Sequence, residues 1–157
     1  MSDTTPDRDH DVGAWEALTR VLVSMASNSA HAGPPGMTFP QIRLLLILHE
    51  LGRVPSSRLA AALGVSASSV TRLADRLEAR GLLVRGRDEH NRCVVTVEVT
   101  EPGRRVVAQV LGFRHAALRA VLDRLPSAQR RVAGAAARRF AAAASAVPVG
   151  ATVSGQL

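Results

Sequence analysis

The chain has 157 residues, of which 46% are hydrophobic and 3% aromatic, and this length predicts one domain whose core is built from Leu, Val and Ala. The formal net charge is +7, and all twenty basic residues are Arg. A single Cys excludes a disulfide framework and a CxxC metal site, and no apolar run approaches the ~18 residues that a membrane-spanning helix needs, so we expect a cytoplasmic protein without membrane contact.

The charge is unevenly distributed along the chain. Residues 1–16 hold one Arg and five acids, which gives −4, whereas residues 53–92 hold eight Arg and four acids, which gives +4. Residues 93–157 hold nine Arg and three acids, which gives +6. A basic body behind an acidic end favours a polyanionic partner, although Arg on solvated helix faces is the competing interpretation for the C-terminal half.

The N-terminal part of the sequence predicts a tail and two helices. Residues 1–10 (MSDTTPDRDH) are polar and are predicted to be disordered. From residue 11 onward apolar residues recur at helical spacing, which predicts a helix to about Ser29. The segment HAGPPGM (31–37) breaks this pattern, and Thr38 with Gln41 forms a capping box for a second helix that runs to Gly52.

The next segment predicts a helix-turn-helix. Pro55 and Ser56 open the helix SRLAAAL, which Gly64 ends, and Ser66 caps the helix ASSVTRLADRLEAR, which ends at Gly81. The longer helix has two chemically different faces. Its apolar face and the residues packed on it are expected to be buried: Leu59, Ala60, Leu63, Val70, Leu73, Ala74 and Leu77. Its opposite face is polar and carries Ser68, Thr71, Arg72, Asp75 and Arg76.

The periodicity then changes from helical to alternating. Residues 82–87 and 93–100 alternate as strands do, with Val95, Val97 and Val99 on one face, and the polar segment DEHNR lies between them. Thr100 caps a further helix to about Leu125, and an Ala- and Arg-rich helix follows to about Ala146. Residues 148–157 are predicted to be a flexible tail. The predicted fold is therefore mainly α with a small β-hairpin wing.

A helix-turn-helix followed by an arginine-bearing hairpin is typical of DNA binding, with one helix in the major groove and the wing beside it. Small hydroxyl side chains at the start of the longer helix allow close approach to bases and phosphates, and its Arg side chains can reach guanine edges. A planar Arg near the hairpin tip can enter a narrow minor groove. The predicted DNA-binding residues are Ser56, Ser66, Ser68, Ser69, Thr71, Arg72, Arg76, Arg85, Arg87, Asn91 and Arg92.

The segment from VSASSVTRLADRLEARGLL to VTEPG resembles the winged helix-turn-helix of the MarR family of bacterial transcriptional regulators. The family's wing has the form D-x-x-D-R-R, with which DEHNRC aligns without a gap, and its following strand ends in L-T-x-x-G, with which VTEPG aligns. The resemblance implies one domain over residues 11–147, with a DNA-binding lobe at 38–100 and dimerisation helices at 11–30 and 101–147. It implies a homodimer, more often a repressor than an activator, that reads a palindrome in double-stranded DNA.

Two residues of the wing depart from the family pattern. Asn91 stands where an Asp usually braces the wing Arg through a salt bridge, and we expect Asn91 to hydrogen-bond Arg92 without the help of charge. Cys93 stands where a second Arg is common, which removes a phosphate contact. We expect these two departures to affect the strength of the contact between the wing and DNA.

The resemblance also implies a cleft that takes small aromatic or phenolic effectors, with no other cofactor. The residues expected to line it are Trp15, Met25, His31, Met37, Phe39, Phe113 and His115. Plain core packing is the alternative for each of them. The five His residues are dispersed and lack the paired spacing of metal ligands, so we expect no metal site.

Several other functions fit parts of the sequence. An architectural DNA-binding protein would use the same basic surface without sequence preference, and a redox- or metal-responsive repressor would act through Cys93 or the His residues. A winged-helix module that binds a protein would have no need of arginines on its wing. We find no catalytic constellation and predict no enzymatic activity; the sequence identifies neither the operator nor an effector.

Overall fold

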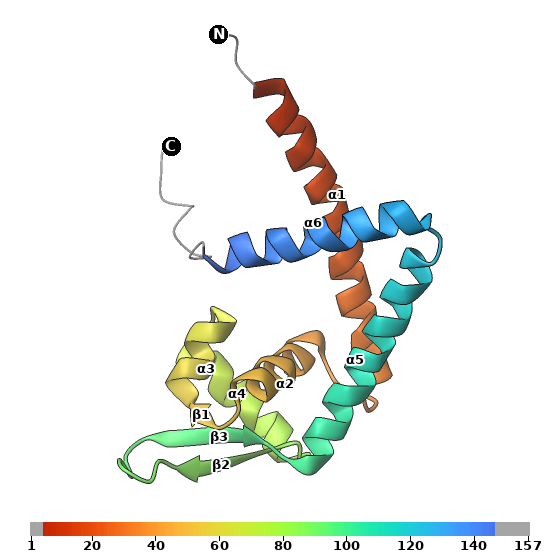
Figure 1. The fold of residues 1–157 in the computed structure, drawn as a ribbon. Helices are drawn as coiled ribbons and strands as arrows, with labels where there is room; N and C mark the ends of the chain where they lie inside the picture. The colour runs from red at the N-terminus through yellow and green to blue at the C-terminus, as the bar shows by residue number, and fades with distance from the viewer. Residues whose placement is uncertain (1–4, 147–157) are drawn as a thin grey trace. The chain divides into compact units, whose positions relative to one another are not determined.

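The computed structural model describes residues 5–146, and the chain divides into two compact units, one ending at His115 and the other beginning at Ala116. The domain predicted over 11–147 thus contributes residues to both units, and the predicted lobe at 38–100 lies within the first. The predicted tail at 148–157 lies outside the described residues. Helices dominate, with one small antiparallel sheet, and this confirms the predicted fold class (Figure 1).

The first unit contains a helix-turn-helix lobe and a β-hairpin wing. Its elements in chain order are α1 (Thr5–Asn28), the short 3-10 helix η1 (Ser29–Ala32), α2 (Phe39–Leu51), β1 (Val54–Pro55), α3 (Ser56–Leu63), α4 (Ala67–Glu78), β2 (Leu83–Arg87), β3 (Val95–Val99) and the first part of α5 (Glu101–Leu122). The strands are ordered β1-β3-β2, and all neighbours are antiparallel. Val97 of β3 is paired with Val54 of β1 on one side and with Arg85 of β2 on the other.

The local signals for helix ends act as predicted. Gly64 adopts the left-handed conformation (φ 66°, ψ 35°) that ends α3 and opens the tight turn. The hydroxyl of Ser66 accepts a hydrogen bond from the N–H of Ser69 at 3.3 Å, which caps α4. Thr100 caps α5 in the same way, since its hydroxyl accepts from the N–H of Gly103 at 3.2 Å.

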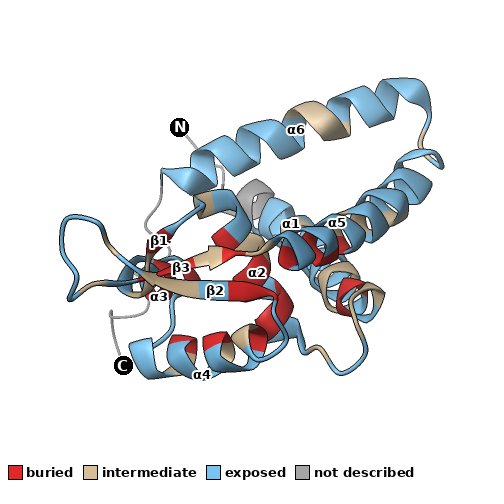
Figure 2. Ribbon diagram, turned by 90° about the horizontal axis from the view of Figure 1, so that it is seen from below, coloured by how far each residue is buried: buried red, intermediate tan, exposed pale blue. Residues whose placement is uncertain are grey.

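The core of the lobe is the predicted apolar face (Figure 2). Leu59, Val70 and Leu77 are at most 1% exposed, and they pack with Leu44 and Leu48 of α2. Leu73 is partly buried against the same cluster. Because these side chains fill the interior of the lobe, the polar face of α4 is left on the outside.

The start of the first helix and one strand differ from the predictions. The first helix begins at Thr5, so residues 5–10, predicted as part of a disordered tail, are helical; Pro6 is compatible with this start, because the first N–H groups of a helix have no partner within it. The β1 strand was not predicted, because two residues are too short to show alternation. It forms because Val54 and Pro55 lie beside β3, where Val54 is buried.

The second unit contains the end of α5 and the helix α6 (Ser127–Ser145). The sequence extends the first of these helices to Leu125, three residues beyond its observed end. No residue of α6 is buried, and Figure 2 shows this helix without buried segments. Val132 of α6 is 70% exposed, so this helix presents an apolar side chain that the described part of the chain leaves largely uncovered.

Candidate nucleic-acid interface

The outward face of α4 is the central feature of the candidate interface. Ser68, Thr71, Arg72 and Arg76 are all exposed on it, as the sequence predicts. Neither Arg72 nor Arg76 forms a hydrogen bond or an ion pair with any residue in the described part of the chain. Two guanidinium groups are therefore held on a rigid helix with their donors directed to solvent.

A groove of about 360 Å³ lies along this face. Its lining combines Arg72, Arg76 and Ser69 with the apolar side chains of Val65 and Leu73 and with Pro40 at the start of α2. Charged donors beside apolar surface suit the major-groove edge of a base pair, which presents acceptors and, in thymine, a methyl group.

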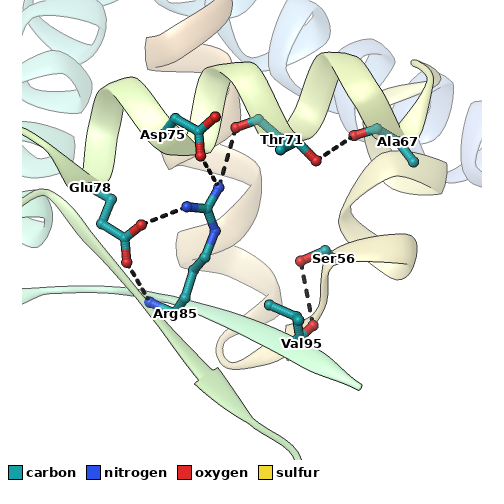
Figure 3. A network of polar contacts seen from close by, with 7 residues as sticks. All are labelled: Ser56, Ala67, Thr71, Asp75, Glu78, Arg85 and Val95. Carbon is teal, nitrogen blue, oxygen red and sulfur yellow. Dashed lines mark hydrogen bonds and ion pairs between the residues drawn. The ribbon is translucent and has the colours of Figure 1, made fainter. Parts of the chain in front are cut away.

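The hydroxyl groups predicted to contact DNA are already engaged within the protein. The Thr71 hydroxyl donates to the carbonyl of Ala67 at 3.0 Å, and Ser56 donates to the carbonyl of Val95 at 3.4 Å (Figure 3). The Ser66 hydroxyl lies 3.0 Å from those of both Ser68 and Ser69. These contacts organise the start of α4 and the base of the wing, while Ser66 and Ser68 stay exposed to solvent.

Hydrogen bonds within the turn organise the wing tip. The Asp88 carboxylate accepts from the N–H groups of His90 (2.9 Å) and Asn91 (3.0 Å), and these bonds hold the pKa of Asp88 below its usual value. The side chain of Asn91 accepts from the N–H of Cys93 at 3.1 Å. The prediction that Asn91 hydrogen-bonds Arg92 is therefore wrong, because the side-chain amide oxygen of Asn91 closes a local turn instead.

The three arginines of the wing have different surroundings. The side chain of Arg92 is exposed and forms no hydrogen bond with any described residue, while its carbonyl accepts from Nη1 of Arg87 at 2.7 Å. The guanidinium of Arg85 is held against α4 by Asp75 and Glu78 (Figure 3). Burial alone would lower the pKa of Arg85, but the hydrogen bonds and charges of those two acids outweigh it and raise the pKa above its ordinary value.

Arg53 precedes β1 and hydrogen-bonds the wing, a role that the sequence pattern did not indicate. Its Nη2 donates to the carbonyl of Arg87 at 2.8 Å, and its Nε donates to the hydroxyl of the buried Thr96 at 3.3 Å. Recognising the β1 strand in the sequence would have indicated this role. Arg53 directly precedes β1, which pairs with β3 and so places Arg53 beside the wing.

The predicted effector residues are only partly brought together. His31, Met37 and Phe39 line a cavity of about 370 Å³, which is also bounded by Pro34, Pro35 and Gly36. Trp15, Met25, Phe113 and His115 do not line it. The loop that contains Pro34, Pro35 and Gly36 is joined to the segment that follows α4, because Nη2 of Arg80 donates to the carbonyl of Pro35 at 2.9 Å.

Other kinds of site have little support among residues 5–146. No group of three or more His, Cys, Asp or Glu side chains in this part of the chain could hold a metal ion. None of its helices is both long and apolar enough to span a bilayer. Cys93 is exposed and is not in a disulfide.

Comparisons with known proteins agree with this geometry. A family model described as MarR family matches residues 36–92, the helix-turn-helix and the first half of the wing. The chain is 28% identical over 137 residues to the HTH-type transcriptional regulator YfiV of Bacillus subtilis (strain 168), a match that covers 83% of this chain and 86% of that protein.

Solved structures share the same fold. RV1404 from Mycobacterium tuberculosis is 29% identical, with a TM-score of 0.77 over 91% of this chain and 97% of that one. A MarR family protein from Bacillus stearothermophilus has a TM-score of 0.82 at 24% identity, over 92% of this chain and 99% of that one. Other solved structures of this fold were determined with bound DNA or an oligodeoxyribonucleotide.

Proposed function

We propose that this chain, which a MarR family model matches over residues 36–92, is a winged helix-turn-helix transcriptional regulator of that family, and that it binds double-stranded DNA sequence-specifically and represses transcription as a homodimer. The observation that carries the proposal is the outward face of α4, where Arg72 and Arg76 have no partner among the described residues and border a groove. The role is regulatory rather than catalytic.

In this proposal α4 is the recognition helix. Its N-terminal end enters the major groove, where the helix dipole favours a nearby phosphate. Arg72 and Arg76 then reach guanine edges or flanking phosphates, and Arg92 at the wing tip reaches the adjacent backbone or minor groove. Ser68 supplies a short exposed hydroxyl between these charges.

Exposed apolar side chains support the homodimer. Leu18, Val21 and Leu22 of α1 are 42–50% exposed, and α6 has no buried residue. Helices of this kind are stabilised when a second copy covers them. A twofold dimer places two recognition helices at half-sites about one helical turn (~34 Å) apart, so the target is a palindrome.

The cavity lined by His31, Met37 and Phe39 supports control by a small aromatic or phenolic effector. Its volume of about 370 Å³ is in the range of small-molecule sites. The hydrogen bond from Arg80 to Pro35 joins the cavity loop to the segment that follows α4. An effector that moves this loop therefore acts on the recognition helix, with a coupling free energy of about 1–3 kcal/mol.

The proposal is tested by selecting bound sequences from fragmented genomic DNA and measuring the affinity for the recovered duplex. We expect Arg72→Ala to relax base preference and Arg92→Ala to weaken binding evenly across sequences. Arg138→Ala in α6 is the matched control, since it removes the same charge outside the lobe. If Arg72→Ala and Arg92→Ala both bound the selected duplex like the wild type, the docking model would be wrong.

Equal affinity for random and selected duplexes would instead favour an architectural DNA-binding protein. Sedimentation at low micromolar concentration tests the dimer, and a monomer there would remove the half-site argument.

A further inference from the structure

Arg85 lies on strand β2 of the wing, but among the described residues its guanidinium hydrogen-bonds only to the recognition helix α4. We propose that Arg85 is a positioning residue that fixes the wing relative to α4 and does not contact DNA itself. The inference rests on the proposed DNA-binding function and revises the sequence prediction that Arg85 is a DNA contact.

The geometry of the contact is that of a clamp (Figure 3). Nη2 of Arg85 donates to Asp75 at 2.7 Å and to the carbonyl of Thr71 at 3.2 Å, while Nη1 donates to Glu78. The backbone N–H of Arg85 also donates to Glu78, at 3.3 Å. Residues 71, 75 and 78 follow one another along a single stripe of the helix, so one side chain of β2 holds two turns of α4.

These contacts leave Arg85 poorly placed to bind a phosphate. Its side chain is 26% exposed, and both terminal nitrogens of its guanidinium are engaged. A phosphate contact through both terminal nitrogens would require it to release Asp75 and Glu78, which are 56% and 39% exposed. Two unpaired carboxylates on the recognition helix would then repel the DNA backbone, which opposes any gain from the new contact.

Two side chains at the starts of β1 and α3 also hold the wing. Ser56 at the start of α3 donates to the carbonyl of Val95 on β3, and Arg53 donates to the carbonyl of Arg87 at the end of β2. With these contacts in place, the Arg85 clamp decides the angle between β2 and α4. The distance between Arg92 on the wing and Arg72 on the helix depends on this angle. The distance matters because both residues must reach the same duplex.

The test compares Arg85→Lys with Arg92→Lys. Lys keeps the charge, and it can contact a phosphate as a point charge, but it cannot bridge two carboxylates as the guanidinium does. We expect Arg85→Lys to bind the selected duplex at least about fivefold more weakly. Arg92→Lys is expected to stay within about twofold of the wild type, because a phosphate contact needs only the charge.

The salt dependence of binding separates the two roles. The slope of log K against log salt falls by about 0.9 for each phosphate that the protein ceases to neutralise. Arg92→Met is expected to show that fall, whereas Arg85→Lys is expected to keep the wild-type slope while binding weakly. Glu78→Ala gives a second arm: it removes an acid near the DNA, yet we expect weaker binding because one side of the clamp is then missing.

Hydrogen exchange without DNA tests the clamp independently of the proposed function. We expect amides of β2 and β3 to exchange at least about fivefold faster in Arg85→Lys than in wild type. Wild-type affinity and slope in Arg85→Lys, with unchanged exchange, would overturn the inference, and so would tighter binding by Glu78→Ala. If wild type itself shows no specific binding, the proposed function fails, while the exchange result still decides whether Arg85 fixes the wing.

Discussion

Among the glycines that the structure describes, Gly103 in the first turn of α5 is the one where a side chain would meet the closest obstacle. A Cβ added there would lie 2.1 Å from the carbonyl oxygen of Leu82 and 2.6 Å from Cγ1 of Val99. Real Cβ atoms essentially never approach another heavy atom within 3.0 Å, so the contact with Leu82 is about 0.9 Å too short. We therefore expect Gly103→Ala to push α5 away from the wing sheet.

The magnitude follows from two opposing effects. Ala is favoured over Gly in a helix by at most about 1 kcal/mol. Overpacking costs about 1–3 kcal/mol, and the upper end applies because the obstacle is the backbone of Leu82 rather than a flexible side chain. The free energy of unfolding should thus fall by about 2 kcal/mol in Gly103→Ala.

Gly112, in the same helix, provides the matched control. Nothing lies within 4 Å of a Cβ added at Gly112, so Gly112→Ala should raise the free energy of unfolding by about 0.5–1 kcal/mol. Urea unfolding followed by circular dichroism measures both variants, at one protein concentration because a dimer's midpoint depends on it. The reasoning is refuted if Gly103→Ala is as stable as wild type while Gly112→Ala is stabilised as expected.

Three further predictions concern the helix-turn-helix and the wing. Leu77→Ala removes a side chain that is 0% exposed and should lower the free energy of unfolding by about 2–5 kcal/mol in the same urea assay; a decrease below about 1 kcal/mol would contradict the assigned core. Ser66→Ala removes the cap of α4 and should cost about 1 kcal/mol, whereas Ser66→Asp should retain most of the stability; equal decreases in both would speak against capping. The pKa of Asp88 is lowered by its hydrogen bonds from His90 and Asn91, so its stabilisation of the wing turn is present at neutral pH and is lost as the pH falls through that lowered value. Asp88→Asn keeps an acceptor without titrating, and amide NMR of the turn should show an acid transition in the wild type that this variant lacks.

Much of the lobe could be predicted because its signals are local. Gly64 must adopt a left-handed conformation to end α3, and Ser66 can cap α4 whatever surrounds it. The apolar spacing of Val70 and Leu77 likewise identifies the buried face of α4, and so leaves Arg72 on the outside.

The elements that were missed depend on contacts between distant parts of the sequence. The β1 strand exists only because Val54 meets Val97, 43 residues later. Arg53 and Arg85 differ little from other surface arginines when seen in the sequence, and only the packed lobe shows what each guanidinium contacts.

Helix caps, glycine turns and apolar periodicity are properties of neighbouring residues, so the order of the longer helices and of the β2–β3 hairpin, the outward face of α4 and the resemblance to the MarR family could all be inferred from the sequence. The division of roles among the arginines could not. Arg72, Arg76 and Arg92 remain directed to solvent, whereas Arg85 is held by Asp75 and Glu78 and Arg53 by the backbone of the wing. Whether a guanidinium group is held within the protein depends on the acceptors that folding brings within about 3 Å of it. Residues far apart along the chain supply those acceptors.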